Sequence, residues 1–484
     1  MMILTLLPLL LPLVGALLMA LPIKGKGRDA IFLALLGGNL AALLLGEVLE
    51  SPGLPELPVG SFAISLSPDG LGRFFGLLFG LLFFLAGLFS LEYNCHDSHQ
   101  SRFNGFYLLT LWALMGLSQA GNLFTFYLFY EAMTIASMPL VFHAGDNTSM
   151  KAALRYLGYS LFGAALVLFG FFYLGQFCRS TDFVAGGSLL PLPEGENGLL
   201  LLAVFALLLG FGCKAGLLPL HHWLPVAHPV APAPASAVLS AAITKAGVLG
   251  ILRVLWYLTG PQVLAGSWVQ RTMVLLAIAT IFTGSMLAWR EKLLKRRLAW
   301  SSVSQVSYAL YGIFTLSLTG LEGALLQILF HGLCKTGLFL FAGAVIHRTG
   351  KTYVWELSGL GRKMPLTFLA FALLSLSLVG IPPFAGFVSK WSLALGGMET
   401  LGGLGVAGAG VLLLSALLTA GYLFPISIHG WTERAQWEDG LEPGWKMLLP
   451  LLLLAFSLLM LGIFTGPGAE LVSGLAREMM GGGL

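Results

Sequence analysis

Four ionisable side chains lie within strongly apolar segments of the sequence, at Glu131, Lys214, Lys245 and Lys390. A charged side chain near the centre of a bilayer costs about 2.5–3.5 kcal/mol on insertion scales, so the four together oppose insertion by about 10 kcal/mol. Such groups contact protein or trapped water rather than lipid, and they often mark routes for ions. Because desolvation favours the neutral form of an amine, we interpret the three lysines as proton carriers.

The single carboxylate in this set predicts an ion pair between Glu131 and Lys214. A pair that only fastens two helices together is the alternative interpretation. Four ionisable groups on four different apolar segments favour a relay over such a structural pair. In that relay Lys245 and Lys390 have no acidic partner.

His331 and Lys335 are four residues apart, so on a helix they share one face. Histidine titrates near neutral pH and can pass protons on, which adds both residues to the predicted relay. The alternative places them near a membrane face, with the Lys335 amine reaching water. Ser240 and Thr244 precede Lys245 at helical spacing, and their hydroxyls either hold ordered water in an access path or simply join two helices.

Two histidines, His221 and His222, precede a proline-rich turn, and a third, His228, lies within it. They are candidates for a path between the relay and the membrane surface, and an interfacial histidine with a structural hydrogen bond is the competing interpretation. Proline removes a backbone donor and breaks helices, so Pro219 and Pro225 predict a helix break here. At membrane depth such a break is tolerated where the freed carbonyls line a cavity or find partners.

A second apolar segment is broken in a similar way, by Pro382 and Pro383 after Gly380. The two breaks are five predicted spans apart, and each has a lysine close by. Because five is odd, the two halves would be inverted relative to each other, as in many transporters. Ordinary proline kinks are the alternative. The predicted units are an N-terminal group of three helices (1–95), two inverted repeats (103–260 and 267–430) and a C-terminal helix (431–484).

The composition excludes a soluble domain. Of 484 residues, 57% are hydrophobic and 10% are charged, and the mean hydropathy is +0.87. Soluble domains carry about 25% charged residues. The sequence therefore predicts an all-α polytopic membrane protein with about fourteen spans, two of them, the seventh and the twelfth, discontinuous. The predicted spans are 2–22, 29–48, 70–91, 104–120, 122–142, 152–176, 198–221, 230–258, 269–289, 299–318, 321–347, 364–395, 404–429 and 445–466.

Loop charges predict the orientation, because Lys and Arg are enriched in cytoplasmic loops. With the N-terminus outside, the inward loops hold most of the basic residues: Lys24, Lys26, Arg28, Lys151, Arg155, Arg290, Lys292, Lys295, Arg296, Arg297, Arg348, Lys351, Arg362 and Lys363. The outward loops hold Glu47, Glu50, Glu56, Asp182, Glu194, Glu196, Glu322 and Glu399. Arg179, Arg253 and Arg271 are exceptions on the outer side. We expect a multi-pass protein of the cytoplasmic (inner) cell membrane with both termini outside.

The four cysteines form no CxxC pair, so we expect no metal centre and no cofactor bound by this chain. The net charge of +4 is spread over short loops, which excludes nucleic acid as a partner. A nucleotide-binding loop and a nucleophile constellation are also absent from the sequence. These observations weigh against an enzyme active site in this chain.

Five segments resemble a known family: NLFTFYLFYEAM (122–133), PLHHWLPVAHPVAPAPASAVLSAAITKAGVLGILR (219–253), KRRLAWSSVSQVSYALYG (295–312), HGLCKTGLFLFAGAV (331–345) and GIPPFAGFVSKW (380–391). They are similar to the antiporter-like subunits of respiratory complex I, Mrp-type cation/proton antiporters, membrane-bound hydrogenases and formate hydrogenlyases. The resemblance covers roughly residues 65–430. It implies fourteen core helices, two inverted five-helix repeats, and a membrane arm built from several such subunits.

The resemblance also implies roles for individual residues. Glu131 matches the glutamate of the fifth helix, Lys214 its partner on the seventh, Lys245 the relay lysine of the eighth, and Lys390 the residue of the twelfth that leads to the exit. His331 and Lys335 match polar positions of the eleventh helix. The chain departs from the family at Leu293, where an acidic residue commonly precedes the basic pair, and at the additional His222.

The sequence therefore predicts a subunit that translocates protons, or exchanges sodium for protons, in a multi-subunit energy-transducing complex. The resemblance implies hydrophobic antiporter-like and small membrane subunits as partners, and a soluble redox arm in the oxidoreductase branches. The main alternative is a stand-alone secondary transporter built on inverted repeats. A scaffold that has lost transport would lack the midplane charges, and all four are present.

Overall fold

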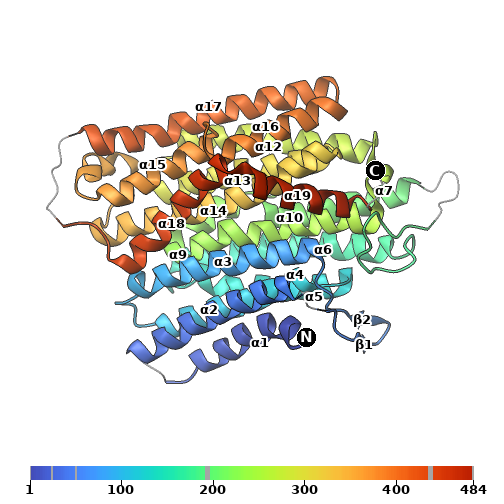
Figure 1. The fold of residues 1–484 in the computed structure, drawn as a ribbon, viewed down its shortest axis with the longest axis horizontal. Coiled ribbons are helices and arrows are strands. Elements are labelled where there is room, and N and C mark those ends of the chain that lie inside the picture. Colours follow the sequence, from blue (N-terminus) through green and yellow to red (C-terminus); the bar gives the residue numbers. More distant parts are fainter. Residues whose placement is uncertain (1, 23–24, 50–51, 191–196, 434–439, 482–484) are drawn as a thin grey trace.

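The computed structural model is an elongated bundle whose long helices run in roughly the same direction (Figure 1). It describes residues 2–22, 25–49, 52–190, 197–433 and 440–481, so Lys24, Glu50, Glu194 and Glu196 of the loop-charge argument lie outside the described residues. Within the described residues, eleven helices are long and apolar enough to cross a membrane, or up to twelve if the bent pair Val354–Arg362 and Pro365–Val379 is one span. The predicted polytopic helical class is confirmed, and the count of fourteen stays a prediction.

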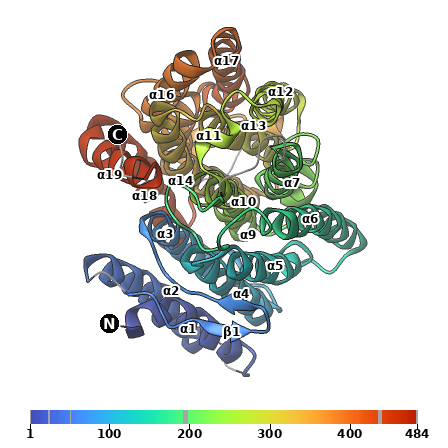
Figure 2. The ribbon, with the colours of Figure 1, turned by 90° about the vertical axis from the view of Figure 1, so that its right-hand side faces the viewer.

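Viewed along the helices, the first six form two layers below the rest of the bundle (Figure 2). Their bounds are α1 Met2–Met19, α2 Gly25–Val48, α3 Gly70–Tyr93, α4 Gln100–Gln119, α5 Leu123–Val141 and α6 Asn147–Leu174. Between α2 and α3 lies a hairpin of β1 (Leu57–Val59) and β2 (Phe62–Ile64), which the all-α prediction missed. Asp69, Asn122 and Asp146 each accept a hydrogen bond from a backbone N–H of the first turn of α3, α5 or α6. Such side chains start helices because the first N–H groups have no partner inside the helix.

The remaining elements cluster beyond these layers. Their bounds are α7 Asn197–Ala215, α8 Leu224–Val230, α9 Ala233–Val238, η1 Leu239–Ile243, α10 Thr244–Leu252, η2 Arg253–Thr259, α11 Pro261–Leu264, α12 Trp268–Arg290, α13 Leu294–Phe314, α14 Leu318–Thr349, η3 Val354–Leu357, η4 Leu360–Arg362, α15 Pro365–Val379, α16 Ala385–Thr400, α17 Gly403–Thr432, α18 Trp445–Ile463 and α19 Thr465–Met479. The helix α19 follows the last predicted span and was not expected. Figure 1 shows both marked termini toward the same end of the bundle.

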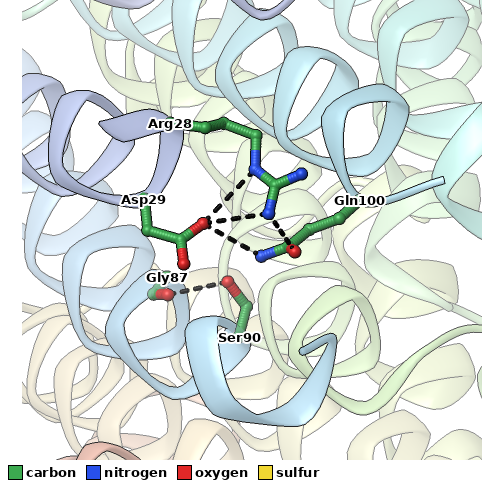
Figure 3. A network of polar contacts seen from close by, with 5 residues as sticks. All are labelled: Arg28, Asp29, Gly87, Ser90 and Gln100. Atoms are coloured by element: carbon green, nitrogen blue, oxygen red, sulfur yellow. Dashed lines mark hydrogen bonds and ion pairs between the residues drawn. The ribbon is translucent and has the colours of Figure 1, made fainter. Parts of the chain in front are cut away.

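A polar network fastens α2 to the start of α4 (Figure 3). The Arg28 guanidinium contacts Asp29 at 3.2 Å and donates to the Gln100 side-chain oxygen. The Gln100 amide also donates to Asp29, at 3.3 Å. One of the predicted inward basic residues is therefore engaged in holding two helices together.

Two of the spans are broken, and a glycine ends the first half of each. Gly216, directly after α7, has φ 84°, and Gly380, directly after α15, has φ 88°. Glycine adopts this left-handed conformation without strain, and it commonly ends helices. Pro219 lies between α7 and α8, and Pro382 and Pro383 lie between α15 and α16.

The predicted break at Pro225 is wrong. Pro225 lies in the first turn of α8, where it begins a helix. A first-turn proline is well tolerated because the N–H that it lacks would have no partner there. The break of the seventh span is therefore confined to residues 216–223.

We predict that Gly380→Ala destabilises the fold. The left-handed conformation disfavours any residue with a Cβ by about 1–2 kcal/mol, and the added atom would lie 2.8 Å from Lys390 Cδ. The expected result is a lower denaturation temperature of the purified protein. Gly403→Ala is the control, since a Cβ there meets nothing within 4 Å. Equal denaturation temperatures for the two variants would show that position 380 does not require glycine.

Candidate functional site

The first candidate lysine, Lys214, lies in the last turn of α7 and is fully buried. Its amine donates to the Tyr156 hydroxyl at 2.8 Å and to Ser160 Oγ at 2.7 Å. The amine also lies 4.2 Å from the centroid of the Tyr156 ring, which adds a cation–π attraction. Tyr156 and Ser160 are four residues apart on α6, so one face of that helix holds the lysine.

The expected direct ion pair between Glu131 and Lys214 is not formed. Glu131 lies on α5 and is half-buried, and its Oε1 is a buried atom without a hydrogen-bond partner. Within the described part of the chain no salt bridge includes Glu131. The two hydroxyls of α6 take the place of the carboxylate. The sequence argument considered only charged partners and therefore missed them.

Lys245 and His331 are in direct contact. The Lys245 amine lies 2.8 Å from His331 Nδ1 and donates to the Ser240 carbonyl at 2.9 Å. Both residues are at most 2% exposed. The sequence placed them on different helices without linking them. A π-helical segment, η1, ends two residues before Lys245, and such segments are frequent at functional sites.

Lys335 belongs to the same polar cluster and does not reach solvent. It is fully buried, donates to Ser301 Oγ, and donates to the Leu298 carbonyl at 3.1 Å. The Ser302 hydroxyl bonds to the same carbonyl at 2.9 Å and lies 2.7 Å from Ser240 Oγ. Hydroxyls of α13 therefore connect the surroundings of Lys335 to the helix that carries Lys245. The alternative of an amine that extends to the membrane face is excluded.

Lys390 lies against the broken end of α15. Its amine donates to the carbonyls of Leu378 and Val379, the latter at 2.9 Å. The last carbonyls of a helix have no partner inside it, and they carry the negative end of the helix dipole. The break that frees these carbonyls thus also provides a site for a positive charge. The Lys390 amine additionally lies 5.1 Å from the Tyr308 ring centroid.

A small cavity of about 10 Å³ lies between His331 and Lys390. Gln305 and Gln327 line it, and the Gln327 amide donates to the Gln305 side-chain oxygen at 3.2 Å. A polar cavity of this size has room for about one water molecule. The cavity therefore offers a bridge between the Lys245–His331 contact and Lys390.

Lys214 and Lys245, unlike Lys245 and His331, are not joined by any described hydrogen bond. Their helices touch at Gly247, where an added Cβ would lie 2.9 Å from Lys214 Cβ. A close backbone approach at Gly247 therefore packs the helix that carries Lys245 against the end of α7. In the sequence, this close approach is indicated by Gly247, two residues after Lys245.

The three predicted access histidines do not form one path. His228 is fully buried, both of its ring nitrogens lack a partner, and its ring stacks on Phe339 at 4.7 Å. His221 and His222 instead lie against Trp300, at 5.6 and 5.9 Å between ring centroids, and His222 is exposed. Of the three, only His228 lies within the buried part of the site.

A cavity of about 630 Å³ opens beside the proline-rich segment. We call it the vestibule; its described lining is Tyr93, Asn94, Asp97, His143, Ala144, Pro229, Val230, Ala231, Pro232, Leu293, Lys295, Ile346, His347 and Thr352. Lys295 was expected in an exposed inward loop, but it is 8% exposed and donates to the Ala231 carbonyl. His228 directly precedes the lining residue Pro229. The vestibule therefore brings solvent close to the buried histidine.

The Asp97 carboxylate contacts the His143 ring at the vestibule, outside the helices. Burial raises the pKa of Asp97, whereas the hydrogen bonds from His143 and from the His99 backbone lower it. The hydrogen bonds outweigh burial, so the net pKa lies below the ordinary value. This carboxylate therefore stays charged at neutral pH.

Arg253 was an exception to the enrichment of basic residues in cytoplasmic loops, and its position is explained by an ion pair with Asp69. Its guanidinium binds the Asp69 carboxylate through two contacts, of 2.5 and 2.7 Å. It also lies 4.7 Å from the Phe183 ring and 4.6 Å from the Tyr257 ring. No pattern in the sequence indicates this pair, because its members are 184 residues apart.

Comparisons with known proteins agree with this geometry. Residues 120–419 match the family model described as NADH:quinone oxidoreductase/Mrp antiporter, TM. The chain is 36% identical to NADH-quinone oxidoreductase subunit N of Desulforudis audaxviator over 382 residues, which covers 75% of this chain and 74% of that one. It is 27% identical to a Na(+)/H(+) antiporter subunit of Bacillus subtilis over 96% of this chain and 94% of that one.

Solved structures show the same fold. A chain of respiratory complex I from Thermus thermophilus with bound NADH superposes with a TM-score of 0.84 at 25% identity, and the match covers 98% of this chain and 99% of that one. The family model matches more than half of this sequence, and the matched residues include all of the relay candidates on helices α5 to α16. The chain therefore belongs to the family of NADH:quinone oxidoreductase and Mrp antiporter membrane subunits.

Proposed function

We propose that this chain translocates protons, or exchanges Na⁺ for protons, as a membrane subunit of a multi-subunit energy-transducing complex. The observation that carries the proposal is the buried contact between Lys245 and His331, which has further polar groups on both sides. Lys245 and His331 are adjacent basic groups in buried surroundings. They cannot both stay protonated, because a positive charge on one disfavours a positive charge on the other. A proton that arrives at one of them is therefore easily passed on.

The proposed route begins at the vestibule. A proton passes Lys295 and His228, reaches Lys335 and Lys245, and moves through His331. The water-sized cavity then leads to Lys390, beside the broken end of α15. Hydroxyls contact Lys245 and Lys335, and two amides line the cavity before Lys390. Side chains that both donate and accept hydrogen bonds can transfer protons along a chain.

Lys214 and Glu131 form the proposed gate. In this structure Lys214 is held by the hydroxyls of α6, and Glu131 is free of a direct partner. A second arrangement, in which Lys214 contacts Glu131, would neutralise the positive charge next to α10 and make a charge on Lys245 easier to hold. Alternation between the two arrangements would take up and expel a proton at Lys245.

The proposed orientation follows from the loops. The vestibule opens beside the start of α13, which carries Lys295, and beside Thr352, which follows Lys351, so we assign it to the cytoplasmic side of the inner membrane. Both termini then lie outside. The two broken spans, each with a lysine at its break, support the proposed inverted repeats 103–260 and 267–430. Proposed partners are further antiporter-like and small membrane subunits and, in an oxidoreductase complex, a soluble redox arm.

Glu131→Gln and Lys214→Met test the gate. We expect each to lower ion translocation at least tenfold, because one of the two arrangements loses its stabilising charge. The measurement is the initial rate of pH change in proteoliposomes that contain the purified complex and are energised by its own driving reaction. Glu56→Gln, at an exposed loop position, is the control and should keep the full rate. Full rates in both gate variants, with normal assembly, would overturn the gate.

A further inference from the structure

Histidines gather at the mouth of the vestibule. Four of the nine histidines in the sequence lie in its lining or in the loop beside it: His96, His99, His143 and His347. The first two belong to the loop between α3 and α4, which also supplies the lining residue Asp97. The proposed route uses none of these groups, although imidazole is the side chain that most readily takes up and releases protons near neutral pH.

The exposure of these groups decreases from the loop toward the cavity. His96 and His99 are exposed, and Asp97 is half-buried. His143, which the Asp97 carboxylate contacts, is 8% exposed. A proton can therefore pass from bulk water to the vestibule through groups that are more and more enclosed.

The contact between Asp97 and His143 is held in place from several sides. The His99 backbone N–H donates to Asp97 Oδ1 at 2.8 Å, and the Arg102 guanidinium donates to the His143 carbonyl at 2.6 Å. The Phe103 ring lies edge-on to the imidazole, with 5.3 Å between the ring centroids. A carboxylate beside an imidazole favours the protonated ring. The pair is therefore a fixed place that can hold an arriving proton.

The interior of the vestibule suits water and protons. The side chain of the lining residue Asn94 is 4% exposed, and its Nδ2 has no hydrogen-bond partner in the described part of the chain. Buried donors of this kind are commonly satisfied by ordered water. The other titratable groups that share the lining with Asp97 and His143 are Tyr93, Lys295 and His347.

The wall formed by the proline-rich segment does not suit Na⁺. Transporters commonly coordinate Na⁺ with backbone carbonyls at the C-terminal ends of broken helices. The carbonyls of Pro229 and Ala231 lie at such an end, but the Lys295 amine already donates to both of them. A proton needs no such set of oxygens, because it moves between neighbouring donors and acceptors.

We propose that five side chains form a proton-collecting cluster that supplies the vestibule, so that the ion entering there is H⁺ and not Na⁺. The members of the collecting cluster are His96, Asp97, His99, His143 and His347. This proposal rests on the proposed function and adds groups that act before the proposed route. When protons are scarce, their capture from bulk water limits transport, and an entrance that concentrates the transported ion raises the rate of capture. The cluster should therefore matter most at alkaline pH.

The test uses the full complex in proteoliposomes, with its driving reaction started from outside and a pH dye enclosed in the lumen. Asp97→Asn with His143→Gln removes both titratable groups of the pair and keeps side chains that form hydrogen bonds. In weakly buffered medium the initial rate of lumen acidification should fall at least fivefold at about pH 8, where a free imidazole is mostly neutral. It should stay within a factor of two at about pH 6.

His429→Gln with Glu433→Gln is the matched control. These two side chains also form a histidine–carboxylate contact, of 2.7 Å, but they do not line the vestibule. The control should keep the full rate at both pH values. Equal rates in the control and in the Asp97→Asn, His143→Gln variant would overturn the proposal.

A mobile buffer separates proton delivery from a structural defect. Glycylglycine, a small zwitterionic buffer added only outside, carries protons to the entrance and should restore at least half of the lost rate. A loss that is equal at both pH values and does not respond to the buffer would overturn the proposal, as would restoration by added Na⁺. If the unmodified complex moves no protons, the proposed function itself fails. An unmodified complex that pumps, with a variant that pumps equally well, rejects the collecting cluster alone.

Discussion

Lys245→Met should lower ion translocation by the complex at least tenfold while the subunit still assembles. Methionine keeps the length and the apolar stem of the side chain but cannot carry a proton. The amine of Lys245 is the group that contacts His331 and Ser240 at 2.8 and 2.9 Å, so its loss interrupts the proposed route at its most buried point. The initial rate of pH change in energised proteoliposomes measures the effect.

The matched control for this variant is Lys292→Met, which removes a charge from an exposed inward loop. It should leave the rate within a factor of two of the unmodified complex. A Lys245→Met complex that pumps at the same rate as the control would show that the proton takes another path.

Asp69→Ala should produce the largest loss of stability. It leaves the Arg253 side chain, which is 1% exposed, without its carboxylate partner, and loss of one member of a buried pair costs about 3–5 kcal/mol. The same change removes the hydrogen bond from the Gly72 N–H that starts α3. The measurement is the denaturation temperature of the purified protein. Asp182→Ala, at an exposed position, should change it little, and similar losses in both variants would contradict this role.

The same pair predicts a pH dependence. Burial raises the pKa of Asp69, but Arg253 and the Gly72 N–H outweigh this, so the net pKa lies below its ordinary value of 3.8. A carboxylate with a lowered pKa contributes stability that is fully present above its unfolded pKa, and that is lost as the pH falls through the folded pKa. The stability difference between the unmodified protein and Asp69→Ala should therefore be constant at neutral pH and shrink only below about pH 4.

The sequence was sufficient to locate the lysines that lie within the helix bundle. Lys214, Lys245 and Lys390 stand out because an amine inside an apolar segment is energetically unfavourable unless the fold compensates for it. The breaks at Gly216 and Gly380 could also be placed closely, since proline and glycine restrict the backbone locally.

The partners of these groups could not be predicted, because they depend on packing between distant segments. Tyr156 and Ser160 are ordinary residues of an apolar helix until α7 brings Lys214 against them. The π-helical segment that precedes Lys245 has no clear sequence signal, and His331 comes from a helix that is distant in the sequence. Lys295 looked like a loop residue, and only the fold of the proline-rich segment buries it.

The most direct test is an experimental map of the assembled complex at a resolution that shows ordered water. The proposed relay requires at least one ordered water between His331 and Lys390, in the cavity lined by Gln305 and Gln327. We predict density for this water. A map in which dry, closely packed side chains separate His331 from Lys390 would contradict proton transfer along this route.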